Sequence, residues 1–112
     1  MADTIWDYTE VIDHWDELIL RAHIVEQDER VLYQEGTLSA LRHPDDLMAA
    51  YRAEIGDKGA MPLPVGTALF CGTMPAIGGI RSSTRFDMEL EDPVTTRTLC
   101  HTVTIKNLPE VV

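Results

Sequence analysis

The chain has 112 residues, and its 9 Lys and Arg against 19 Asp and Glu give a formal net charge of −10. This length predicts a single domain over residues 1–112, and the acidity excludes nucleic acid and anionic membranes as main partners, since both bind clustered Lys and Arg. No apolar run is long enough to span a membrane and the first residues lack a signal-peptide pattern, so we expect a cytoplasmic protein that acts on a small molecule.

The first third of the sequence predicts a short helix followed by a β-hairpin. Asp7 and Glu10 have the spacing of a capping box, and apolar residues then recur at helical spacing, which predicts a helix over Thr9–Glu17. Apolar and polar residues alternate after it, on both sides of a polar turn at Gln27. This period of two predicts a hairpin over Leu18–Thr37.

The middle of the chain predicts a second helix and then a buried strand. Pro44 suits the first turn of a helix, which we expect to run to Ile55 and to end in the glycine-containing segment Gly56–Gly59. The apolar run Ala68–Cys71 predicts a buried strand that leads into a loop rich in glycine and proline.

The last third predicts a second hairpin, with Phe86 beginning one apolar face and Leu99 another. Together these elements predict a mostly β (β+α) protein, a mixed β-roll of hairpins with about five strands and two short helices. Parallel βαβ winding is the weaker alternative, because the strands come as hairpins.

The loop after the predicted buried strand is the first candidate site. Its glycines would let backbone N–H groups approach a ligand, and the Thr73 hydroxyl could hold a carboxylate or enolate oxygen. A plain turn between strands explains the same residues. The candidate substrate-binding residues are Gly72, Thr73, Met74, Pro75 and Gly78.

Three carboxylates at period two form the second candidate site. Asp87, Glu89 and Glu91 share one face of a predicted strand, where they could bind a hard cation or supply a general base. A solvated face partly balanced by Arg85 is the alternative.

The histidines and cysteines show no metal-ligand spacing, and we expect no metal site built from them. His101 falls on the apolar face of the last strand, where a core histidine is a simpler interpretation than a ligand. Cys71 and Cys100 are expected to be reduced thiols.

Several segments resemble the fumarylacetoacetate hydrolase family, in particular the C-terminal half of its members and an uncharacterised bacterial branch beside it. The segments that show the resemblance are Pro64–Gly79, Tyr33–Thr37, His14–Asp16 and Phe86–Pro93.

The resemblance implies a β-roll fold and metal-assisted acid–base chemistry on a small oxo-acid or β-diketo acid, by C–C hydrolysis, decarboxylation or hydration. It implies a divalent cation (Mg²⁺, Mn²⁺ or Ca²⁺) in the complete fold, Thr73 at a substrate oxygen, and Glu89 as the catalytic residue.

The chain also departs from that family. Thr67 replaces an aspartate, Met74 is inserted into a Gly-Thr-Pro motif, and the half that supplies metal ligands is missing. The alternative hypothesis is therefore a non-catalytic truncated or split-subunit module used for binding or assembly. We expect a homo-oligomer, or a partner that supplies the missing half.

Overall fold

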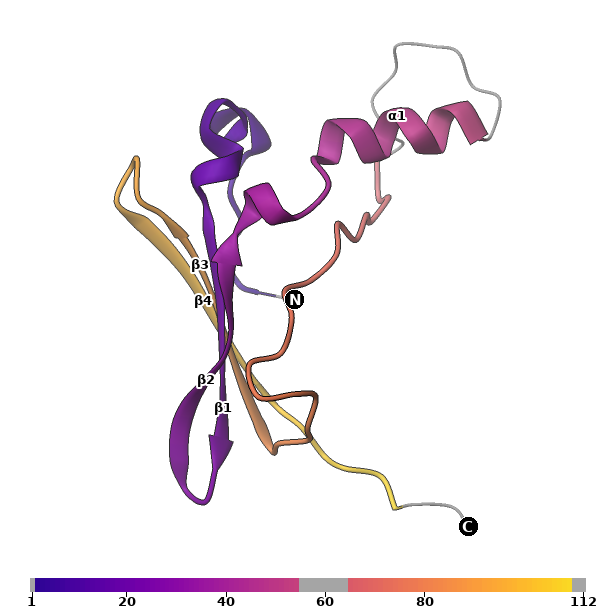
Figure 1. Cartoon of the computed structure of the whole chain (residues 1–112). Coiled ribbons are helices and arrows are strands. Elements are labelled where there is room, and N and C mark those ends of the chain that lie inside the picture. The colour runs from indigo at the N-terminus through magenta and orange to yellow at the C-terminus, as the bar shows by residue number, and fades with distance from the viewer. Residues whose placement is uncertain (1, 55–64, 110–112) are drawn as a thin grey trace. The chain divides into compact units, whose positions relative to one another are not determined.

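The computed structural model describes residues 2–54 and 65–109, and Figure 1 traces the whole chain. The chain divides into two compact units. One comprises Met1–Ala40 with Met74–Val112, and the other comprises Leu41–Thr73. Each is described by itself below.

The larger unit is built on a four-stranded antiparallel sheet. Its strands are β1 (Ile19–Glu26), β2 (Glu29–Thr37), β3 (Arg85–Asp92) and β4 (Arg97–Thr104). They lie in the order β2-β1-β3-β4, so β2 and β4 form the two edges (Figure 1). Both predicted hairpins and the β+α class are confirmed. The sheet of the described residues is wholly antiparallel, and this corrects the prediction of a mixed sheet.

The strand registers sort the side chains onto two faces. Leu20 lies opposite Leu90, and Leu90 lies opposite Leu99, so these residues share an apolar face. Arg21 lies opposite Glu89 on the other, polar face. The β1–β2 pairing contains a bulge next to Ala22, whereas the eight β3–β4 pairs run without a shift.

Part of the apolar face is covered by the loop that precedes β3. Ala22 and Ile24 are buried on this face, and Met74 from the loop is 3% exposed. Gly36 leaves the space that Met74 fills, because a Cβ at this glycine would lie 2.8 Å from the Met74 Sδ atom. The core of the larger unit therefore depends on a loop residue as well as on the strands.

The predicted N-terminal helix is instead two 3-10 helices, η1 (Tyr8–Glu10) and η2 (Ile12–Glu17). The Asp7 cap is confirmed, since its carboxylate accepts a hydrogen bond of 2.9 Å from the backbone N–H of Thr9. The backbone at His14 is non-helical (φ −132°), which prevents a continuous α-helix. A third 3-10 helix, η3 (Leu38–Ala40), follows β2.

The smaller unit contains the α-helix α1 (Pro44–Glu54), which confirms the second predicted helix up to Glu54. Ile55 and the predicted stop at Gly56–Gly59 lie outside the described residues. The predicted buried strand Ala68–Cys71 is wrong: these residues form no strand, and Phe70 is 94% exposed. A short apolar run becomes a buried strand only where a neighbouring strand pairs with it, and the sequence pattern does not include that neighbour.

Among the described residues, no helix has the length and apolar character needed to cross a membrane.

Candidate functional site

The loop predicted to bind substrate is divided between the two units. Gly72 and Thr73 end the smaller unit, whereas Met74, Pro75 and Gly78 belong to the larger one. Thr73 does not follow a buried strand, because the residues before it form none. Its predicted contact with a substrate oxygen stays a prediction without that rigid support.

The part of the loop in the larger unit is attached to β2. The Gln34 side-chain amide donates a hydrogen bond to the Met74 carbonyl, and the Ile77 N–H donates to the Tyr33 carbonyl at 2.7 Å. The Tyr33 hydroxyl accepts from the Arg81 N–H at 3.2 Å. These bonds join two sequence segments that the motif analysis noted separately, and they show that Met74 packs against the sheet.

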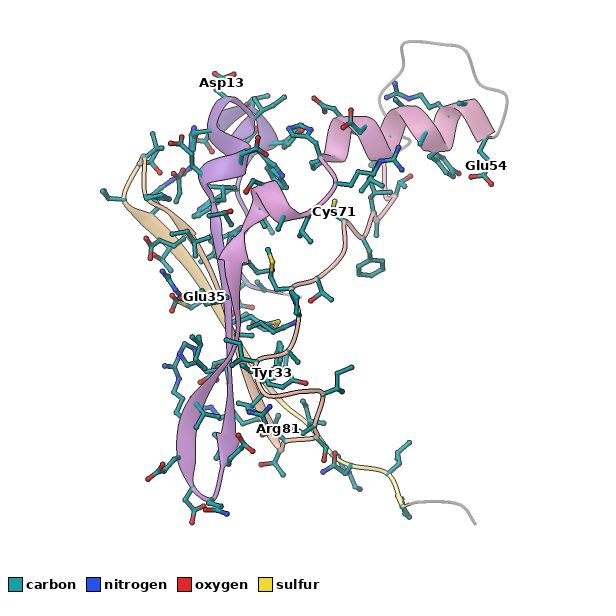
Figure 2. All side chains as sticks on the ribbon, viewed as in Figure 1. Asp13, Tyr33, Glu35, Glu54, Cys71 and Arg81 are labelled. Atoms are coloured by element: carbon teal, nitrogen blue, oxygen red, sulfur yellow. The ribbon has the colours of Figure 1, made fainter. Side chains whose placement is uncertain are left out.

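Arg81 completes this attachment. Its guanidinium lies 5.1 Å from the centre of the Tyr33 ring, as the two labelled side chains in Figure 2 show. It also donates to both carboxylate oxygens of Glu26, at 2.9 and 2.8 Å, and to the carbonyls of Ile77 and Gly79. The hydrogen bonds between Arg81 and Glu26 lower the pKa of Glu26 and raise that of Arg81. Neither Glu26 nor Arg81 was predicted from the sequence as a site residue, although Arg81 is the basic residue that directly follows the glycine-rich loop.

Glu89, the predicted catalytic residue, lies on the polar face in a cluster centred on Arg21. Arg21 donates to Glu35 at 2.7 Å, to Glu91 at 2.8 Å and to Glu89 at 3.2 Å. The hydrogen bonds to Glu91 and Glu35 raise the pKa of Arg21 well above its ordinary range. Glu89 and Met74 lie on opposite faces, since Met74 packs at Gly36, which pairs with Leu20. The sheet therefore separates Glu89 from the predicted substrate loop at Met74.

The Asp87 carboxylate is also paired with basic side chains. Arg85 and Arg30 each donate to its carboxylate at 2.9 Å, and the Thr102 hydroxyl donates at the same distance. The hydrogen bonds from Arg85 and Arg30 hold the pKa of Asp87 well below its usual range. The described part of the chain contains no group of three or more His, Cys, Asp or Glu residues arranged to bind a metal. The carboxylates of the polar face are thus paired with arginines of the same sheet.

The apolar face contains a pocket of about 400 Å³ beyond the area that Met74 covers. His101 lies in it as a half-buried side chain, and no hydrogen bond to its ring is found within residues 2–54 and 65–109. The pocket is lined by Ala2, Leu20, Met88, Glu89, Leu90, Leu99, Cys100, His101 and Val103.

A second pocket, of about 460 Å³, adjoins the first. The two share Ala2, Leu90 and Leu99. The second is also lined by Trp6 and by Trp15 of η2. The guanidinium of Arg97, the first residue of β4, lies 4.8 Å from the centre of the Trp6 ring. An apolar concavity with one imidazole group therefore runs along the sheet, a composition typical of small-molecule sites.

His14 and Asp92 form the best-buried polar pair in the described residues. The His14 Nε2 atom lies 2.7 Å from Asp92 Oδ2, and Asp92 is 0% exposed. Burial opposes the ionised form of Asp92, but hydrogen bonds from His14, Thr95 and Val94 outweigh it and lower its pKa to about 2. Because the carboxylate only accepts, His14 Nε2 is the donor. The hydrogen bond links η2, which contains His14, to the start of the β3–β4 turn at Asp92.

The family model described as "Protein of unknown function (DUF2848)" matches residues 1–103, and the chain belongs to that family. No curated protein and no solved structure matches the chain. The assignment to the fumarylacetoacetate hydrolase family is therefore wrong. The resemblance depended most on a loop thought to follow a buried strand, and that strand is not formed.

Proposed function

We propose that this chain is a binding module that holds a small molecule on the apolar face of its sheet. The ligand would have an apolar body and one carbonyl or carboxylate group. The body would lie against Leu20, Leu90 and Leu99, and the polar group would accept a hydrogen bond from His101.

The observation that supports the proposal is that the pocket lining is mostly apolar and contains a single histidine. Six of its nine lining residues are alanine, leucine, methionine or valine, and His101 is the one imidazole. The other two, Glu89 and Cys100, are paired with each other and belong by register to the polar face. An imidazole has a ring N–H that can donate to a carbonyl or carboxylate. Largely apolar lining with few polar groups is the pattern by which proteins bind and orient small ligands.

The volume of the pocket also suits a ligand of this kind. Each of the two adjoining pockets, of about 400 and 460 Å³, lies within the usual range of small-molecule sites. Burying one methylene group contributes about 0.8 kcal/mol, so a short alkyl chain would account for appreciable affinity.

We prefer a binding role to metal-assisted acid–base catalysis, because the carboxylates that such catalysis would need are already paired with arginines. Glu89 and Asp87, the carboxylates expected to act in such chemistry, are held by Arg21, Arg30 and Arg85. Oxo-acid chemistry with a divalent cation rested on the family resemblance and stays an untested expectation.

Calorimetric titration with 2-oxo acids of increasing alkyl chain length would test the proposal. We expect each added methylene to strengthen binding about fourfold until the pocket is filled. The dye anilinonaphthalene sulfonate, which is apolar and anionic, supplies an independent probe by displacement.

The His101→Ala variant should weaken binding about threefold to tenfold, the effect of one hydrogen bond. His23→Ala is the matched control, because His23 lies opposite Asp87 on the polar face and should leave affinity unchanged. Affinity independent of chain length, or equal in the two variants, would contradict the proposal.

A further inference from the structure

We infer that the outer edge of β4 is a self-pairing surface: a second copy of this chain adds its own β4 in antiparallel orientation and continues the sheet. The outer edge is the side of β4 that faces away from β3. The inference goes beyond the proposed function and does not depend on it. It is based on the difference between the two edges of one sheet.

The β2 edge has the features by which proteins prevent edge pairing. It contains the charged residues Glu29, Arg30 and Glu35, and its pairing with β1 is interrupted by a bulge. Its Tyr33 carbonyl already accepts a hydrogen bond from Ile77 in the loop. Charges, bulges and covering loops all disfavour the addition of another strand.

The β4 edge has none of these features between Thr98 and Thr104. This segment, Thr-Leu-Cys-His-Thr-Val-Thr, contains no Asp, Glu, Lys, Arg, Pro or Gly. Its eight pairs with β3 run without a bulge. Within the described part of the larger unit, no backbone hydrogen bond outside the sheet engages β4. Its outer N–H and C=O groups are therefore a template for a further strand.

The charge distribution favours a second copy as the partner on this strand. Two copies with a net charge of −10 each repel one another over most of their surfaces. The segment from Thr98 to Thr104 is neutral apart from His101, so two copies can approach there without placing carboxylates against carboxylates.

The sequence of β4 is also complementary to itself. Directly opposite residues in an antiparallel pair share a face. With His101 on the twofold axis, Leu99 faces Val103 of the second copy on the apolar side. On the other side Thr98 faces Thr104 of the second copy, and Cys100 faces Thr102.

A register centred on Cys100 fits less well, because it places the charged Arg97 opposite the apolar Val103 inside the paired strands. With His101 on the axis, the position opposite Arg97 is Ile105, which lies beyond the end of β4. In the register centred on His101, both copies bring Leu99, His101 and Val103 to the axis. These residues line the apolar pocket, so each copy would extend the pocket of the other.

Light scattering and sedimentation of paired-charge variants test the inference. Replacing both Thr98 and Thr104 by lysine puts two like-charged pairs across the axis, and we expect dimerisation about tenfold weaker or worse. This variant has a net charge of −8, since two lysines are added to −10, so weaker association could not come from overall repulsion.

The double variant Thr98→Lys with Thr104→Glu should dimerise at least as well as the unaltered chain, because opposite charges then face one another. Its net charge stays −10, as one positive and one negative charge are added. Thr37→Lys on the β2 edge is the matched control and should leave the dimer unchanged. Equal dissociation constants for the two double variants would overturn the register.

Oxidative cross-linking tests the contact directly. With Cys71 and Cys100 changed to serine, His101→Cys should give a covalent dimer, whereas Glu35→Cys on β2 should not. A monomer at every concentration would overturn the inference. So would a dimer that His101→Cys fails to cross-link, since this would mean that the copies pack through another surface.

Discussion

The two faces of the same four strands satisfy their side chains in different ways. On the polar face, Arg21 alone engages three carboxylates, and Asp87 accepts hydrogen bonds from two arginines, so these charged groups are paired within the chain. On the apolar face, Met74 covers one end while Leu90 and Leu99 border open pockets. The difference indicates that binding should be sought on the apolar face.

Removing the cover of the apolar face should have the largest effect. Met74→Ala deletes a buried side chain, and we expect the free energy of unfolding to fall by about 2–5 kcal/mol. Urea unfolding followed by tryptophan fluorescence measures this, because Trp6 and Trp15 both lie in the larger unit. Ile77→Ala is the control within the same loop, since Ile77 is 49% exposed and should cost far less.

A second substitution distinguishes lost packing from a general loss of the loop. Gly36→Ala places a Cβ in the space of the Met74 Sδ atom, so alone it should destabilise the chain. In the Met74→Ala background the new methyl group has room, and the two effects should not add. Additive effects would show that Met74 stabilises the fold by some contact other than the one at Gly36.

Breaking the polar face should have a smaller effect. Arg21→Ala leaves Glu35, Glu89 and Glu91 without their shared cation, and we expect a loss of about 1–2 kcal/mol, because solvent screens part of these hydrogen bonds. Equilibrium unfolding in urea measures the loss. Arg42→Ala, an exposed arginine of the smaller unit, should change stability by less than about 0.5 kcal/mol. Equal losses would mean that the cluster adds no stability.

The sequence predicted the two faces because alternation is a local signal. The run from Arg85 to Glu91 alternates charged and apolar residues, and β3 keeps that division. The helix starting at Pro44 was equally local, since its first-turn proline and acidic residues lie within the element itself. Local patterns therefore identified the elements that form from neighbouring residues.

The candidate site was harder to predict because it depends on contacts between distant residues. Met74 was assigned to a ligand, yet it fills the space at Gly36, 38 residues earlier, counting 74 − 36. The His14–Asp92 bond joins residues 78 positions apart. The apolar run Ala68–Cys71 failed as a strand for the same reason, since strand formation requires a partner that periodicity does not reveal.

The least disruptive change concerns Asp92, the last residue of β3, and it should appear chiefly as a change in the pH dependence of stability. Its pKa is about 2 in the folded chain against an ordinary 3.8. A lowered carboxyl pKa stabilises the fold at pH values above the ordinary pKa, and this contribution disappears as the pH falls from about 4 to about 2.

The variant Asp92→Asn keeps an oxygen that accepts hydrogen bonds from the backbone of Val94 and Thr95, so the turn should persist while the charge is lost. We therefore expect the variant to be less stable than the unaltered chain at pH 6, with the difference shrinking as the pH approaches 2. Thermal unfolding of both proteins across this range measures it. A stability difference that stays constant with pH would show that the charge of Asp92 contributes nothing to the stability of the fold.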